Sequence, residues 1–259
     1  NMIILAGIAV VIVVAIAGVL LIGGNGGNQD TNTDDDDINT GDNPLAIIET
    51  TKGTFQIELF KDKVPITAQN FINHAKSGYY DGLIFHRVIS SFMIQGGDPN
   101  GDGSGGHAAE YHEGYGNEND PNSWVIPDEF HPNLSNVRGT ISMANSGPDT
   151  GGSQFFINVV DNIYLDYNKY LDQTTGQIIN EEVSYPQDRS KHAVFGEVVE
   201  GMEVVDEISE VNTNSNNKPL ENVVINNITI QEWYLSNSGC YMNRKKAKFE
   251  TSLGTFTVE

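Results

Sequence analysis

The sequence predicts a mainly β domain, a closed antiparallel barrel with two short helices over its ends, preceded by a transmembrane helix. Three observations predict this class. Short stretches that alternate apolar and polar residues recur between Gly-rich turns along residues 45–235. Only two stretches place apolar residues at helical spacing. Met2–Ile22 forms a continuous apolar run, within a predicted anchor of residues 1–23. Many strands with few helices are typical of a closed barrel with covered ends.

Composition excludes several classes of function. The chain has 259 residues, enough for one large domain or two small ones. Its 35 acidic and 14 basic residues give a net charge of −21. We therefore expect no nucleic-acid partner, because phosphate binding needs clustered Lys and Arg. Cys240 is the single cysteine, which excludes an intramolecular disulfide and a Cys-based metal site.

The N-terminal segment predicts a single-pass membrane anchor. Met2–Ile22 carries no charged residue, and a helix of this length covers the roughly 30 Å hydrocarbon core. A cleaved signal peptide is the alternative, and Ala15–Ala17 is similar to a cleavage signal. No Lys or Arg follows before Lys52, which predicts a cell-membrane protein with its domain outside the cytoplasm. Residues 24–44 predict a flexible acidic linker.

Local signals define the elements of the domain in order. Two strands are predicted first, followed by a helix that begins at a proline and ends before Gly78. A second helix and a last strand come near the end of the domain. The predicted ranges are Ala46–Thr50, Thr54–Phe60, Pro65–Lys76, Met202–Ser209 and Val223–Trp233.

The stretch Phe85–Gly97 combines a cation, an amide and large apolar side chains. Strand alternation places Met93 and Gln95 on the face opposite Phe92. Arg87 with these side chains has the composition of a pocket that holds an apolar group beside a polar bond. A sheet core with Arg87 extended to water explains the stretch equally well at this point.

A Gly-rich loop follows and is a weak calcium candidate. Asp98, Asn100 and Asp102 occupy positions 1, 3 and 5 of an EF-hand-like loop, and Gly103 follows at position 6. Position 12 is Ala109, where calcium needs a bidentate Glu. A Gly-rich turn without metal is the alternative. The sequence predicts no other metal site and no cofactor.

Three segments together resemble the signature segments of the cyclophilin-type peptidyl-prolyl cis-trans isomerases. They are Phe85–Gly97, Arg138–Ile157 and Lys191–Met202, in the family's order. The resemblance covers about Leu45–Trp233, within a predicted domain of residues 45–235, and implies an eight-stranded antiparallel barrel with two capping helices. It implies an enzyme that rotates peptide bonds preceding proline, with proline-containing polypeptides as partners and no cofactor.

The resemblance also implies roles for individual residues. The catalytic group would comprise Arg87, Phe92, Gln95 and His192, with His192 as a wall of the proline pocket rather than a base. Amide rotation has a barrier of about 18–20 kcal/mol, and an arginine lowers it only by binding the twisted amide more strongly than the planar one. The remaining pocket and groove residues would be Met93, Ala144, Asn145, Ser146, Gln154, Phe156, Tyr164 and Leu165.

The chain departs from the family pattern at the far rim of the groove. Tyr164 stands where many members have Trp, which predicts weak binding of cyclosporin-type ligands. An insertion, Tyr167–Ser190, separates Leu165 from His192. Leu171 lies in a second Tyr-Leu-Asp triplet and is an alternative wall residue; the spacing from Phe156 favours Leu165.

Residues 236–259 form a tail with a partial repeat. Residues 247–259 parallel residues 46–58, with Ala, Glu, Thr, Gly, Thr, Phe and Glu recurring at a constant offset. This pattern indicates the opening hairpin of a second unit of the same kind, and a disordered tail with a chance match is the alternative.

The sequence thus predicts an extracytoplasmic folding catalyst that isomerises bonds preceding proline. Two other readings stay open. A module that binds proline-containing segments, or acts as a chaperone, with little catalysis would use the same pocket. A calcium-stabilised surface domain would use the loop at Asp98.

Overall fold

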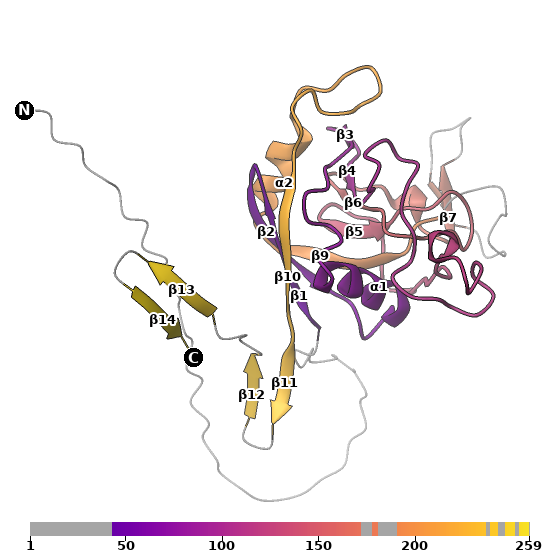
Figure 1. The fold of residues 1–259 in the computed structure, drawn as a ribbon. Helices are drawn as coiled ribbons and strands as arrows, with labels where there is room; N and C mark the ends of the chain where they lie inside the picture. The colour runs from indigo at the N-terminus through magenta and orange to yellow at the C-terminus, as the bar shows by residue number, and fades with distance from the viewer. Residues whose placement is uncertain are drawn as a thin grey trace, which may run out of the picture. The chain divides into compact units, whose positions relative to one another are not determined.

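The computed structural model describes residues 43–171, 178–180, 191–236, 239–242, 247–251 and 254–258 (Figure 1). The predicted membrane anchor, and the linker up to residue 42, lie outside the described residues. Within the described ranges, no helix is both long enough and apolar enough to cross a membrane.

The domain is built on one antiparallel sheet of eight strands. Their order is β10-β1-β2-β9-β5-β6-β4-β3, so sequence neighbours β1–β2, β3–β4 and β5–β6 pair directly. The strand bounds are β1 Leu45–Thr50, β2 Gly53–Leu59, β3 Arg87–Ile89, β4 Met93–Gly96, β5 Thr140–Met143, β6 Phe155–Asn158, β9 Val194–Glu200 and β10 Ile225–Gln231.

The prediction of a closed barrel is wrong, because the sheet is an open half-barrel with β3 and β10 as its edges. β3 is only three residues long, and it forms no continuous hydrogen-bonded ladder with β10, the other edge strand. The chain before it meets the chain before β10 at one isolated bridge, Ile84 to Val224. Single backbone hydrogen bonds, such as Phe85 N to Val223 O at 3.0 Å, complete that contact.

Both predicted helices are confirmed with the predicted bounds. α1 spans Pro65–Lys76, with Pro65 in its first turn, and packs against β9 and β10. α2 spans Met202–Ser209 and packs against β2, β3 and β4. Each helix buries its apolar stripe, including Phe71 and Ile72 on α1 and Val205 on α2.

A cluster of buried aromatic rings connects the core to the functional face. Phe71 and Phe155 contact edge to face, with ring centroids 5.4 Å apart, and both are fully buried. Burying each such side chain contributes about 1.5–3 kcal/mol. Strand alternation in β6 directs the next residue, Phe156, away from this cluster. The core thereby fixes the strand that presents Phe156 on the opposite face.

Short elements complete the described residues. They are η1 Pro121–Ser123 and η2 Ile163–Leu165, and the paired strands β7 Lys169–Leu171 with β8 Ile178–Asn180, β11 Trp233–Ser236 with β12 Gly239–Met242, and β13 Ala247–Thr251 with β14 Gly254–Val258.

Two of these pairs bear on sequence predictions. The predicted last strand is divided, because β10 ends at Gln231 and β11 begins at Trp233. In the tail, Thr251 pairs with Gly254, as Thr50 pairs with Gly53 in the β1–β2 hairpin. The two hairpins share one register.

Candidate active site

A cavity of about 240 Å³ opens on the face of the sheet formed by β3, β4 and β6. Every residue that lines it is among those the sequence singled out. The lining residues are Arg87, Phe92, Met93, Gln95, Ala144, Asn145, Phe156, Leu165 and His192. Their side chains combine an apolar floor with one cation and two amides.

The side chain of Phe92 reaches this cavity by a route that simple alternation misses. β4 begins at Met93, so Phe92 belongs to the turn between β3 and β4 and does not follow the strand period. Its ring packs 5.8 Å from the guanidinium carbon of Arg87 and stacks on Tyr164 at 6.4 Å. Tyr164 does not line the cavity; it supports Phe92 at the rim.

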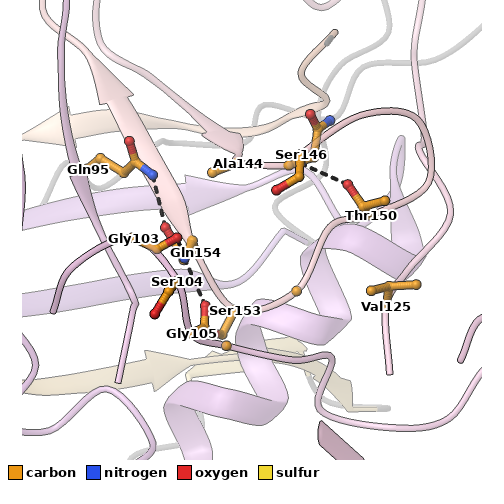
Figure 2. Close-up of a pocket in the computed structure, with 13 residues that line it drawn as sticks. Gln95, Gly103, Ser104, Gly105, Val125, Ala144, Ser146, Thr150, Ser153 and Gln154 are labelled. Atoms are coloured by element: carbon orange, nitrogen blue, oxygen red, sulfur yellow. Dashed lines mark hydrogen bonds between the residues drawn. The ribbon is translucent and has the colours of Figure 1, made fainter. Parts of the chain in front are cut away.

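Arg87 is oriented by a chain of amide hydrogen bonds that begins at Gln95. Figure 2 shows the part of this chain that runs through Gln95 and Gln154. Arg87 pairs with Gln95 across β3 and β4, and its Nη1 donates to Gln95 Oε1 at 3.2 Å. Gln95 Nε2 donates to Gln154 Oε1 at 2.9 Å. Gln154 Nε2 then donates to the carbonyls of Gly105, at 2.8 Å, and Gly103, at 3.1 Å. In the described part of the chain no carboxylate forms a salt bridge with Arg87, so its charge is not neutralised there.

His192 forms the opposite wall as a neutral ring. Its imidazole contacts Phe156 edge to face at 5.1 Å. Its Nδ1 lies 2.9 Å from Met143 O, and because a carbonyl only accepts, Nδ1 carries the proton. Burial lowers the pKa of His192; the hydrogen bond to Met143 O opposes this, and nearby Lys191 lowers the pKa further. The ring is therefore neutral near pH 7 and suits a pocket wall.

A second cavity of about 190 Å³ adjoins the first and shares Gln95, Ala144 and Asn145 with it (Figure 2). It contains the two remaining predicted groove residues, Ser146 and Gln154. Sequence reasoning missed its other lining residues, which present mainly backbone and small hydroxyl groups: Gly103, Ser104, Gly105, Gly106, Val125, Thr150, Gly152 and Ser153.

The calcium candidate is a loop that hydrogen-bonds to itself. The Asp98 carboxylate accepts backbone N–H groups of Asn100 at 2.9 Å, Asp102 at 3.0 Å, Gly103 at 2.5 Å and Gly105 at 3.0 Å. Burial would raise the pKa of Asp98, but these hydrogen bonds outweigh it and lower the pKa. Within the described ranges no group of three or more His, Cys, Asp or Glu could hold a metal ion. The carboxylate instead fixes the loop that supplies the Gly103 and Gly105 carbonyls.

Arg87 has no salt bridge within the described ranges and lies beside an apolar cavity, on a β half-barrel with two packed helices. This arrangement suits an apolar group next to a polarised amide. Comparison with known proteins gives the family. The model for "Cyclophilin type peptidyl-prolyl cis-trans isomerase/CLD" matches residues 45–230. The chain belongs to this family and is an isomerase that acts on peptide bonds preceding proline.

Individual relatives agree. A putative peptidyl-prolyl cis-trans isomerase of Staphylococcus aureus is 39% identical over 191 residues, 72% of this chain and 91% of the relative. The isomerase CYP71 of Arabidopsis thaliana is 41% identical over 185 residues, which is 71% of this chain but 24% of that protein. Two crystal structures of a Cryptosporidium parvum cyclophilin-type isomerase are similar in fold. The first has a TM-score of 0.57 at 30% identity, covering 75% of this chain and 99% of that one. The second, in the presence of the dipeptide Ala-Pro, has a TM-score of 0.56 at 31% identity, covering 74% and 99%.

Proposed function

We propose that the isomerase works by Arg87-assisted twisting of the peptide bond, with the proline ring held in the 240 Å³ cavity. The observation that carries this proposal is the position of Arg87 at the edge of that cavity, oriented by Gln95 and without a salt bridge in the described residues. Phe92, Met93 and Phe156 receive the ring.

In this proposal, rotation about the peptide bond is accelerated by electrostatic stabilisation of the twisted amide alone. Twisting the bond breaks amide resonance and returns a lone pair to the prolyl nitrogen. A guanidinium that donates to this nitrogen, or holds the neighbouring carbonyl, binds the twisted state more strongly than the planar state. Only such differential binding accelerates rotation, and each 1.4 kcal/mol gives about tenfold in rate. Gln95 fixes the guanidinium in advance, so little reorganisation is needed during the twist.

The shape of the groove supports an extended proline-containing segment as the substrate. The cavity that holds the proline ring continues into the second cavity through Gln95, Ala144 and Asn145. The residues flanking proline lie along this path and contact amide and carbonyl groups there. The related isomerase solved in the presence of Ala-Pro supports this substrate class.

The isomerase acts outside the cytoplasm, held at the membrane by the apolar segment Met2–Ile22. The support is the sequence: a charge-free run long enough for the bilayer, followed by acidic residues and no Lys or Arg before Lys52. Protease treatment of intact and permeabilised cells tests this proposal. Digestion of the domain in intact cells is expected, and protection until permeabilisation would contradict it.

A peptide exchange assay with binding measured in parallel tests the catalytic proposal. The full chain is added to a short peptide with one bond preceding proline, and cis–trans exchange is followed by NMR. Exchange far faster than the uncatalysed process, which takes tens of seconds, is expected. Binding without faster exchange would instead identify a proline-peptide binding module.

A further inference from the structure

A lysine is buried behind the far wall of the proline cavity, where the insertion rejoins the domain. Lys191 has an exposed fraction of 2%. It directly precedes His192, and its backbone begins the last segment before β9. Burying an ammonium group is unfavourable unless hydrogen bonds compensate it. Such a residue therefore belongs to a defined local arrangement.

The hydrogen bonds of Lys191 join three segments of the groove. Its Nζ donates to Tyr164 O at 3.0 Å, in the turn that carries Leu165, and also to Lys169 O in the first part of the insertion. Its own carbonyl accepts from Asn145 Nδ2 at 2.7 Å. Both Asn145 and Leu165 line the proline cavity. Lys191 thus connects Asn145 with the turn that carries Tyr164 and Leu165.

A second buried group, Asp166, fixes the same region from the other side. Asp166 is 4% exposed and Asn136 is 1% exposed. Asp166 Oδ1 accepts from Asn136 N at 2.7 Å and Nδ2 at 2.9 Å, and Oδ2 accepts from Ser135 Oγ at 2.5 Å and Lys169 Nζ at 3.2 Å. Asn136 Nδ2 also donates to His192 O at 3.2 Å.

The two ends of the insertion are therefore held together at the cavity wall. His192 N donates to Leu165 O at 3.2 Å, so the two wall residues share one backbone contact across the insertion. Backbone carbonyls and a buried carboxylate hold the chain on both sides of this contact. Without Lys191 Nζ, the Tyr164 and Lys169 carbonyls would lose a charged donor in a buried site.

We infer that Lys191 is a positioning residue for the proline pocket: its ammonium group holds the Tyr164–Leu165 wall at a fixed distance from His192 and Asn145 despite the insertion between them. The inference rests on the proposed function of the cavity. Lys191 does not line the cavity and touches no reacting atom. Lys191 affects the substrate only by positioning Leu165 and Asn145, which line the cavity. Its loss should therefore weaken substrate binding more than it slows the twisting step.

The test compares the full chain with Lys191→Met, which keeps the length of the side chain and removes its charge and donors. Peptide affinity comes from NMR titration, and the exchange rate constant is taken at saturating peptide. We expect Kd to rise about tenfold, because small misplacements of a binding wall are costly, while the rate constant at saturation stays within about threefold. The split between Kd and rate is the decisive readout, because a change confined to stability would alter neither quantity in the folded protein.

Lys52→Met is the matched control. Lys52 forms an exposed ion pair with Glu207 outside the proline cavity, and its replacement should leave Kd and rate unchanged. Lys191→Gln is the second variant if Lys191→Met does not fold. Its amide is one atom shorter and cannot reach both carbonyls, so the same weakening is expected.

An unchanged Kd in a folded Lys191 variant would overturn the inference, as would loss of affinity and rate in equal proportion. A different result would contradict the proposed function: the unmodified chain would bind the peptide without accelerating its cis–trans exchange. The comparison of Kd values would still decide the role of Lys191 in that case.

Discussion

Replacing Gln95 with Leu removes the group that orients Arg87 while nearly preserving the volume of the side chain. The change deletes the acceptor of Arg87 Nη1, 3.2 Å away, and the donor to Gln154, 2.9 Å away. A hydrogen bond to a charged group contributes about 1.5–3 kcal/mol. Without Gln95, the guanidinium of Arg87 has to be oriented during the twist. The free energy needed to orient it reduces the stabilisation of the transition state.

We expect the exchange rate constant at saturating peptide to fall roughly tenfold, which corresponds to about 1.4 kcal/mol. Peptide Kd should change less, because the apolar floor of the cavity stays intact. Exchange NMR and titration on the same samples provide both quantities. Gln56→Leu is the control, since Gln56 bonds Glu200 in an exposed part of the sheet.

Loss of affinity with an unchanged rate constant at saturation would refute this reasoning. It would show that Gln95 serves mainly as a substrate contact and that Arg87 needs no orientation by it. A rate constant equal to that of the unmodified chain, with unchanged Kd, would refute it as well.

Three further predictions concern stability. Burial lowers the pKa of His74 to about 4. Between pH 6.5 and 4 the unfolded chain therefore binds more protons than the folded chain. The free energy of unfolding should then fall with decreasing pH in that window. Urea unfolding at pH 7 and pH 5 measures this fall, and an equal fall in His74→Gln would contradict the assignment. Gly97 has φ 83°, and a Cβ there would lie 2.4 Å from Ser153 O. Gly97→Ala should therefore destabilise the domain by at least about 1–2 kcal/mol in the same urea assay. Unchanged stability would contradict the clash. Because backbone amides occupy the Asp98 carboxylate, calcium or a chelator should leave the melting temperature unchanged within about 1 °C, whereas a calcium-dependent rise would restore the calcium-stabilised reading.

Local signals in the sequence predicted the helices well because their limits depend on nearby residues. Pro65 starts α1, and Gly78 follows its end. Closure of the sheet could not be predicted in this way. It depends on whether β3 and β10, far apart in the chain, meet over several residues, and the short β3 leaves a single bridge there.

The lining of the 240 Å³ cavity was largely predictable because side chains of distinctive type form it, in segments that resemble a known family. Strand alternation places Phe92 on the face opposite Met93, and this is wrong because Phe92 lies in the turn before β4 and lines the same cavity as Met93. The second cavity was missed because glycine carbonyls and small hydroxyl groups give no side-chain signal in a sequence. Its clue was the Gly-rich run after Asp98, which also resembles a calcium loop. The contacts of Lys191 were not predictable, since they depend on the path of the insertion.

The central claim is that Arg87 lowers the barrier to rotation, and Arg87→Ala tests it most directly. The measurement is the catalysed cis–trans exchange rate of a short peptide by exchange NMR, on a variant whose circular dichroism and melting curve match those of the unmodified chain. Removal of one preorganised hydrogen-bond donor at a transition state typically reduces rate by about 10²–10³. We predict a loss of this size at saturating peptide with a much smaller change in Kd. An exchange rate equal to that of the unmodified chain would contradict the mechanism.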